Sequence, residues 1–192
     1  MPLTLPNQLT LLRMGLTPLF LILLLSRQYG WTLLVFMLAA FTDALDGFIA
    51  RLWRQKTTLG AYLDPVADKM LLAIAILGLA LSEFPNRIPV SFAIFFLARD
   101  VIILVVILAT FFTTERRGLF RPSLLGKATT LFQILLVADA LFYNWRGVPS
   151  PHLSTLLWIA FSATALSAVQ YSLLTSRNLA ATQEQNARRM TR

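Results

Sequence analysis

The chain has 192 residues, of which 57% are hydrophobic and only 14% are charged, and its net charge is +8. Soluble domains carry about 25% charged residues, so this composition excludes an ordinary soluble fold and predicts a membrane protein. The absence of cysteine excludes disulfides and zinc–cysteine sites. With one histidine, His152, any metal must be a hard ion such as Mg²⁺ or Mn²⁺ held by oxygen atoms. The basic residues indicate contact with anionic lipid rather than nucleic acid, since no nucleic-acid-binding motif is present.

Six apolar stretches are long enough to cross a membrane, which takes about 20 residues. They cover residues 8–26, 30–50, 62–82, 88–112, 124–144 and 153–175, with proline or glycine near several of their ends. We expect the first to be a span rather than a cleavable signal, because it lacks a basic leading segment and Arg13 interrupts it. The sequence therefore predicts an all-α integral membrane bundle of six transmembrane helices over 1–176. We expect the polar cytoplasmic tail, 177–192, to be a short frayed helix or disordered.

The basic residues are divided unequally between alternate loops, which predicts an orientation. Eleven lie in one set of loops and in the tail: Arg51, Arg54, Lys56, Arg116, Arg117, Arg121, Lys127, Arg177, Arg188, Arg189 and Arg192. Three lie in the opposite loops: Arg27, Arg87 and Arg146. The other three lie within predicted spans: Arg13, Lys69 and Arg99. Because basic loops stay in the cytoplasm, both termini are predicted to be cytoplasmic, and the protein to be multi-pass in the inner (cytoplasmic) membrane.

Six of the nine acidic residues fall within or beside apolar stretches: Asp43, Asp46, Asp64, Asp68, Asp100 and Asp139. A carboxylate at the bilayer centre costs about 2.5–3.5 kcal/mol. Asp43 and Asp46 are three residues apart near the end of the second span, and Asp64 and Asp68 are four apart where the third begins. Each pair shares a helix face, and the short connection allows the two pairs to face each other. Four carboxylates so close must share protons or bind cations, and two metal ions would suit phosphoryl chemistry.

Helix packing or ion transport would also account for aspartates within apolar stretches. They could form polar contacts between helices, with Arg51 or Lys69 as partners, or line the cation path of a transporter. Gly47 and Gly60 lie nearby, and glycine allows a ligand to approach the backbone closely, although it also serves helix packing. The aspartates lie in the predicted cytoplasmic half, whereas transporter sites lie more often near the midplane. The pattern therefore favours a metal-bound nucleotide site.

The segment from 43 to 68 resembles the signature of the CDP-alcohol phosphatidyltransferases. It reads Asp43-Ala-Leu-Asp46-Gly47-Phe-Ile-Ala50-Arg51, then eight residues, then Gly60-Ala-Tyr-Leu-Asp64-Pro-Val-Ala-Asp68. Every constrained position of that signature is present at the right spacing, and the six predicted spans also match the family.

This resemblance implies a function and a role for each signature residue. The ligands of two divalent ions, Mg²⁺ or Mn²⁺, would be Asp43, Asp46, Asp64 and Asp68. The pocket for the CDP-lipid would be lined by Gly47, Ala50, Arg51 and Gly60. Asp68 would also act as general base on the acceptor hydroxyl. The phosphatidyl group of CDP-diacylglycerol would pass to an acceptor alcohol and CMP would leave; the resemblance also implies a homodimer.

Two further segments resemble the phosphatidylglycerophosphate synthases of this family, whose acceptor is glycerol 3-phosphate. The first is Pro6-Asn7-Gln8-Leu9-Thr10-Leu11-Leu12-Arg13, and it implies that Asn7 and Thr10 contribute to CDP-lipid binding. The second is Gly126-Lys127-Ala128-Thr129-Thr130-Leu131-Phe132-Gln133. It resembles their Gly-Lys-x-Lys-Thr-x-x-Gln pattern, except that Thr129 replaces the second lysine.

Arg99-Asp100 instead resembles the CMP-forming cardiolipin synthases, whose acceptor is phosphatidylglycerol. Both acceptors carry a glycerol hydroxyl and a phosphate, so the same basic residues would serve either. The residues predicted to bind the acceptor are Arg13, Lys69, Arg99 and Lys127. Glycerol 3-phosphate is the favoured acceptor and phosphatidylglycerol the alternative. Asp139, away from the four aspartates, is predicted to be a structural partner of a neighbouring polar group.

Overall fold

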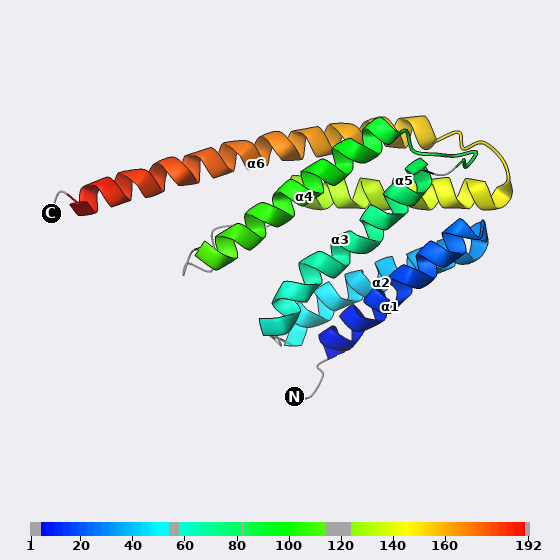
Figure 1. The fold of residues 1–192 in the computed structure, drawn as a ribbon, viewed down its shortest axis with the longest axis horizontal. Coiled ribbons are helices and arrows are strands. Elements are labelled where there is room, and N and C mark those ends of the chain that lie inside the picture. Colours follow the sequence, from blue (N-terminus) through cyan, green and yellow to red (C-terminus); the bar gives the residue numbers. More distant parts are fainter. Residues whose placement is uncertain (1–4, 54–57, 82, 114–123, 191–192) are drawn as a thin grey trace.

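The protein forms six α-helices in a computed structural model (Figure 1). The structure describes residues 5–53, 58–81, 83–113 and 124–190, and the side chains of 11–42, 69–81, 83–105 and 124–172. The helices are α1 (Leu5–Leu25), α2 (Tyr29–Trp53), α3 (Thr58–Leu81), α4 (Val90–Thr113), α5 (Leu124–Arg146) and α6 (Leu153–Met190). Each predicted span coincides with one helix, and the described residues contain no strand. The all-α prediction is confirmed for this part of the chain.

Helix length agrees with a membrane location. At about 1.5 Å per residue, the 21 to 25 residues of α1 to α5 match a hydrocarbon core of about 30 Å. By length and composition, the described parts of two helices can cross a membrane, Leu124–Arg146 and Leu153–Ser172. The described apolar parts of α1, α2 and α3 are shorter, at 10–17 residues. These helices support membrane association, and the count of six spans stays a prediction.

Helix α6 extends beyond the span predicted for it. It has 38 residues and continues without a break to Met190. The segment from 177 to 190 contains Ala, Gln, Glu and Arg, which favour helix. The predicted boundary at residue 176 is therefore not a break in secondary structure, and the cytoplasmic location of the segment stays a prediction.

Helices α3 and α5 lie at the centre of the bundle. Helix α3 contacts α1, α4 and α5, and α5 contacts α2, α3 and α6. The largest fully buried apolar side chains come from five helices: Phe20, Leu24, Phe36, Ile76, Leu79, Phe96, Leu136 and Leu141, with Ile88 from the connection before α4. In Figure 1 the α1–α2, α3–α4 and α5–α6 connections gather at the right-hand end, which we call the connecting end, and both termini lie toward the other.

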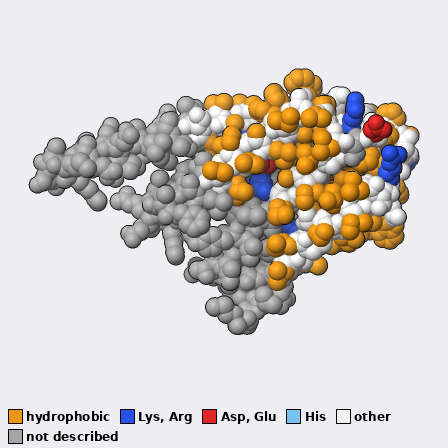
Figure 2. All heavy atoms as spheres, in the orientation of Figure 1, with side chains coloured by type: hydrophobic (Ala, Val, Ile, Leu, Met, Phe, Trp, Pro, Cys, Tyr) orange, Lys and Arg blue, Asp and Glu red, His pale blue; other side chains and the backbone are white. Residues whose placement is uncertain are grey.

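The flank of the bundle is strongly apolar. In Figure 2, hydrophobic side chains cover much of the described surface in view, and most of the visible charged side chains gather at the right-hand end. Large side chains more than half exposed include Ile22, Trp31, Phe41, Ile94, Ile102 and Val169. Buried polar side chains beneath an exposed apolar flank are the reverse of a soluble protein, because a large exposed apolar patch marks contact with lipid or another protein. The surface thus supports membrane association.

Amide side chains join the connections at the connecting end. The Asn86 backbone N–H and Nδ2 both donate to Asn144 Oδ1, over 2.9 and 3.1 Å, and Nδ2 also donates to the Val148 carbonyl. The Ser150 N–H donates to Asn86 Oδ1 over 2.6 Å. Both asparagines are almost fully buried, so these bonds satisfy groups that water cannot reach.

The Ser150 hydroxyl completes the same end by capping α6. Ser150 Oγ accepts hydrogen bonds from the N–H groups of His152 and Leu153, each 3.1 Å long. The hydroxyl itself donates to Asp139 Oδ2 of α5 over 2.5 Å. The prediction that Asp139 is a structural partner of a nearby polar group is confirmed.

Candidate active site

The four aspartates of the signature lie on two consecutive helices. Asp43 and Asp46 belong to the last three turns of α2, and Asp64 and Asp68 to the first three turns of α3. Their side chains lie outside the described residues, as do those of Asn7, Thr10, Gly47, Ala50, Arg51 and Gly60. Among the side chains that are described, no group of three or more His, Asp or Glu gathers to hold a metal ion. The predicted metal and CDP-lipid sites therefore stay predictions.

A cavity of about 160 Å³ lies next to these helix positions. Its polar lining is Arg13 of α1, Lys69 of α3 and Thr130 of α5, and the rest of its lining is apolar. On α2, the lining residue Ala39 precedes Asp43 by four residues, and on α3 Lys69 directly follows Asp68. Positions four apart share a helix face one turn apart, so the cavity lies within about one turn of the helix positions that carry Asp43 and Asp68. The structure thus brings together Arg13 and Lys69, two residues predicted to bind the acceptor.

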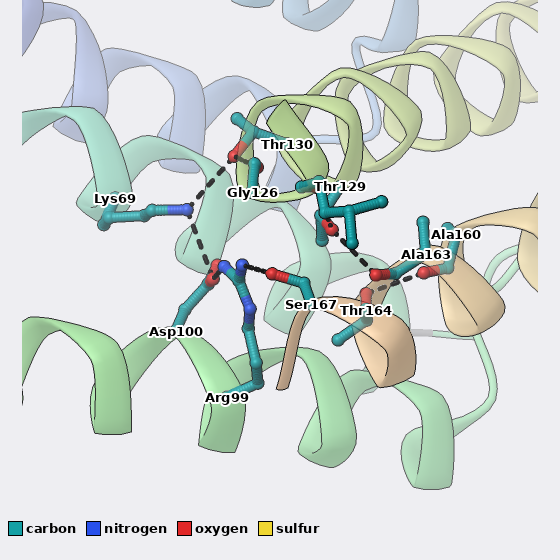
Figure 3. Close-up of polar contacts among 11 residues, drawn as sticks. Lys69, Arg99, Asp100, Gly126, Thr129, Thr130, Ala160, Ala163, Thr164 and Ser167 are labelled. Atoms are coloured by element: carbon teal, nitrogen blue, oxygen red, sulfur yellow. Dashed lines mark hydrogen bonds and ion pairs between the residues drawn. The ribbon is translucent and has the colours of Figure 1, made fainter. Parts of the chain in front are cut away.

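Lys69 is held by partners from two other helices (Figure 3). Its Nζ donates to Asp100 Oδ1 of α4 over 3.2 Å and to Thr130 Oγ1 of α5 over 3.3 Å. The Lys69 side chain is 28% exposed and the Asp100 side chain 12%. Asp100, whose role the sequence left open, is therefore the counter-ion of Lys69.

Arg99 shares the same carboxylate and joins α4 to α6. Its Nη1 donates to Asp100 Oδ1 over 2.7 Å, and its Nη2 donates to Ser167 Oγ (Figure 3). Its guanidinium carbon lies 5.9 Å from the centre of the Tyr171 ring, which is within range of a cation–π contact. Arg99 is only 6% exposed, yet its Nε has no hydrogen-bond partner among the described residues.

Lys127 is not part of this cluster. Its side chain is exposed on α5, whereas Thr130, three residues later, reaches Lys69. Thr129 is fully buried and donates to the carbonyls of Leu125 and Ala163, over 2.9 and 3.1 Å. In this packing, a lysine at position 129 would place its charge in the α5–α6 interface.

Sequence reasoning marked Asp100 as a carboxylate in an apolar stretch and Thr130 as the threonine of the Gly-Lys-x-Lys-Thr-x-x-Gln pattern, but it did not pair them with Arg99 or Lys69. Ser167 and Tyr171 were not singled out, because hydroxyl-bearing residues are common in membrane helices and often bond neighbouring helices. Gln133 gives a stronger signal, because it is fully buried on α5 and neither end of its amide has a partner among the described residues.

The described part of the cluster carries more positive than negative charge. The cations are Arg13, Lys69 and Arg99, and among the described side chains Asp100 is the carboxylate that bonds Lys69 and Arg99. Arginine and lysine held in low-dielectric surroundings suit phosphate or another anion. The arrangement can therefore bind a phosphate group beside the two helices that carry the signature aspartates.

Comparison with known proteins decides the family. Residues 3–169 match the family model described as CDP-alcohol phosphatidyltransferase. The chain belongs to this family. The resemblance inferred from residues 43 to 68 is thereby confirmed.

Several curated phosphatidyltransferases are similar to this chain along most of its length. A CMP-forming cardiolipin synthase of Rattus norvegicus is 35% identical over 188 residues, covering 88% of this chain and 61% of the relative. One of Streptomyces coelicolor is 36% identical over 150 residues, covering 71% and 66%. A CDP-diacylglycerol–glycerol-3-phosphate 3-phosphatidyltransferase of Salmonella choleraesuis is 34% identical over 170 residues, covering 86% of each. The chain thus spans less than two thirds of the first of these relatives.

Proposed function

We propose that the chain is a CDP-diacylglycerol-dependent phosphatidyltransferase of phospholipid synthesis. The observation that carries this proposal is the family match over residues 3–169, which includes the complete aspartate signature. The cation-lined cavity next to that signature supports it. A phosphate-bearing acceptor bound at Lys69 and Arg99 would lie beside the helix turns that carry Asp64 and Asp68.

The proposed reaction is a direct displacement at the phosphorus attached to diacylglycerol. The acceptor hydroxyl oxygen forms the new bond to that phosphorus, the bond to the CMP oxygen breaks, and Asp68 takes the hydroxyl proton. Asp43, Asp46, Asp64 and Asp68 would hold two divalent ions, Mg²⁺ or Mn²⁺, which supply charge neutralisation for the diphosphate and the leaving CMP. Oxygen donors are the ligands that such ions prefer, so the residues present suit them.

The acceptor we propose first is glycerol 3-phosphate. The match to the Salmonella relative named for that acceptor covers 86% of that protein and 86% of this chain, so the two correspond almost end to end. Arg13, Lys69 and Arg99 would bind the acceptor phosphate, whose two negative charges need more than one cation. Lys127, which is exposed on α5, would attract the anion from solution rather than hold it.

Phosphatidylglycerol is the second candidate acceptor. One observation in its favour is that buried Thr129 stands where the glycerophosphate pattern has its second lysine. The other is the Arg99-Asp100 pair, which resembles the cardiolipin synthases. The cardiolipin synthases of Rattus norvegicus and Streptomyces coelicolor also support it by similarity.

We further propose that all six helices cross the inner membrane, with both termini and the active site on the cytoplasmic side, and that the protein is a homodimer. The supporting observations for the orientation are the eleven basic residues in alternate loops and the tail, and the position of the aspartates near that end of α2 and α3. The dimer rests on the family resemblance.

The test is an acceptor panel with the detergent-purified chain. CDP-diacylglycerol, Mg²⁺ or Mn²⁺ and one acceptor at a time are supplied, CMP release is measured, and the lipid product is identified by mass. We expect release with one glycerol-containing acceptor, and loss of at least 99% of it with EDTA or in Asp68→Asn, about a hundredfold. Glu83→Gln, an exposed acid at the connecting end, is the matched control. Cation flux through liposomes with no CMP release from any acceptor would contradict the proposal and favour a transporter.

A further inference from the structure

A second and larger hollow lies at the connecting end, far along the helices from Lys69. This groove of about 760 Å³ is formed by the α1–α2 connection, the first turns of α2 and the end of α5. Its lining combines aromatic, aliphatic and cationic side chains: Arg27, Gln28, Tyr29, Trp31, Leu34 and Trp145. The proposed chemistry uses none of them.

Packing against neighbouring residues holds the groove in shape. A Cβ atom at Gly30 would lie 2.9 Å from Cδ1 and Nε1 of Trp145, so the indole lies directly against the α2 backbone because residue 30 has no side chain. Tyr29 packs edge-on against Phe84, with ring centres 5.3 Å apart. Packing thus fixes the positions of Tyr29 and Trp145, which are two of the three aromatic side chains in the groove.

The backbone places Arg27 at this groove in a defined position. Its φ is 58°, in the left-handed region, which is the geometry that ends many helices. The Arg27 N–H donates to the Leu24 carbonyl and the Gln28 N–H to the Leu23 carbonyl, each over 3.0 Å. These two bonds close the C-terminal end of α1 and fix the backbone position of Arg27.

The exposed surface of the groove is that of a lipid-water boundary. Trp31 is 62% exposed and Trp145 57%, and Leu34 beside them is nearly half exposed. Tryptophan and tyrosine concentrate where a helix leaves the hydrocarbon region. An acyl chain can follow the leucine and the indoles, because all three side chains are apolar and exposed along the groove.

The charge at this end matches an anionic headgroup. Arg27 lines the groove, and no acidic residue of the described part of the chain does. Arg87, Arg146 and the acidic Glu83 are exposed at the same end, so that with Arg27 the exposed cations outnumber this acid, while Asp139 is bonded to Ser150. A guanidinium beside an apolar surface recognises phosphate while the chain of the same molecule remains in hydrocarbon.

We propose that this groove binds one anionic phospholipid from the leaflet at the connecting end, with its phosphate at Arg27 and an acyl chain along Leu34, Trp31 and Trp145. The lipid is a bound neighbour and not a substrate, because the groove and the signature aspartates lie toward opposite ends of α2. The proposal requires that the chain is embedded in a membrane, and it is independent of the acceptor.

The test uses the full chain in lipid nanodiscs and the fluorescence of its own tryptophans. Nanodiscs of phosphatidylcholine are doped with phosphatidylcholine or phosphatidic acid that carries bromine on the acyl chain and quenches nearby indoles. Phosphatidic acid is chosen because it is neither of the acceptor candidates. We expect half-maximal quenching at a lower fraction of phosphatidic acid than of phosphatidylcholine, and this preference should fall about fivefold in Arg27→Asn.

Three variants and one assay make the result decisive. Asparagine is used at position 27 because it tolerates a positive φ; Arg27→Lys should keep the preference, and Arg87→Asn, at the same end outside the groove, should not change it. Equal quenching by both lipids in the unmodified chain, or an unchanged preference in Arg27→Asn, would overturn the proposal. The proposal would also be overturned if neither lipid quenched the indoles and the protein were a dimer that Trp31→Arg separates into monomers. In that case a second copy of the chain would cover the groove. CMP release, measured on the same samples, reports separately on the proposed function and should be unchanged in Arg27→Asn.

Discussion

Two buried polar clusters of this bundle differ in their charge and in how fully their polar groups are hydrogen-bonded. At the connecting end, Asn86, Asn144 and Ser150 form a neutral network in which amide groups find partners in the neighbouring connections. Toward the other end, Lys69, Arg99 and Asp100 form a charged network that crosses from α3 to α6. In both networks, hydrogen bonds within the protein take the place of hydrogen bonds to water for polar groups inside an apolar bundle.

The difference lies in what each network leaves unsatisfied. The side-chain amides of Asn86 and Asn144 all bond within the connecting end, whereas Arg99 Nε has no partner among the described residues. Unpartnered buried groups are expensive, and native proteins retain them mainly where a ligand or water completes them. The neutral network therefore serves folding, and the charged network is the one prepared for a ligand.

The largest effect is expected when the charged network loses Arg99. Arg99→Ala should raise the KM for the acceptor about 10- to 100-fold, because charge-assisted hydrogen bonds contribute about 1.5–3 kcal/mol each. The measurement is CMP release as a function of acceptor concentration. Arg99→Lys should recover only part of the loss, since a single ammonium cannot serve both Asp100 and Ser167 as the guanidinium does.

Lys127→Ala is the matched control for that prediction. It removes a cation of the same helix bundle whose side chain is exposed and outside the cluster, and it should change the KM less than about threefold. Equal changes in KM for Arg99→Ala and Lys127→Ala would show that the cluster attracts anions only through its overall charge.

The next largest effect is on stability, at the connecting end. Asn144→Ala removes the acceptor of two hydrogen bonds from Asn86 and should lower the free energy of unfolding by about 1–3 kcal/mol. The folded fraction should keep its KM, because this network lies away from Lys69. Thermal unfolding in detergent measures the first effect, and Thr155→Ala, exposed on α6, should change it by less than about 0.5 kcal/mol. A raised KM with unchanged unfolding would reverse the roles of the two networks.

Removal of the shared carboxylate separates binding from folding within the charged network. Asp100→Asn removes the carboxylate that Lys69 and Arg99 share among the described residues, so the free protein should lose about 1–2 kcal/mol of stability. A bound acceptor phosphate would supply the missing negative charge. Saturating acceptor should therefore raise the Tm of Asp100→Asn more than that of the unmodified chain, and an equal rise in both would argue against phosphate binding here.

The sequence predicted the helices well because each apolar run of about 20 residues is bounded by polar or turn-forming residues. It could not predict which faces meet. Exposed side chains and side chains that face the core are equally apolar here, so no amphipathic stripe marks the buried face. The exposed Ile94 and the buried Phe96 of α4 illustrate this, because their hydrophobicity does not distinguish them.

The same limit applies to the site. Arg13, Lys69 and Arg99 were predicted to bind the acceptor because the chain resembles synthases whose acceptors carry a phosphate, and the structure gathers them near one cavity or carboxylate. Their partners were not predicted, since Lys69 and Asp100 are 31 residues apart and Thr130 is 61 from Lys69. Asn86 lies between two predicted spans and Asn144 at the end of another, 58 residues away, so the sequence does not pair them.

The smallest predicted effect tests whether α6 positions Arg99. Ser167→Ala removes the hydroxyl that accepts from Arg99 Nη2 and should cost about 0.5–1.5 kcal/mol, seen as a rise of a few fold in the acceptor KM with little change in kcat. Ser167→Thr, which restores the hydroxyl, should recover the KM. Thr164→Ala is the matched control, because Thr164 is equally buried on α6 but bonds only the Ala160 carbonyl of its own helix. If both alanine variants raise the KM alike, α6 acts through packing; if Ser167→Ala alone does, the hydroxyl orients the guanidinium toward the acceptor.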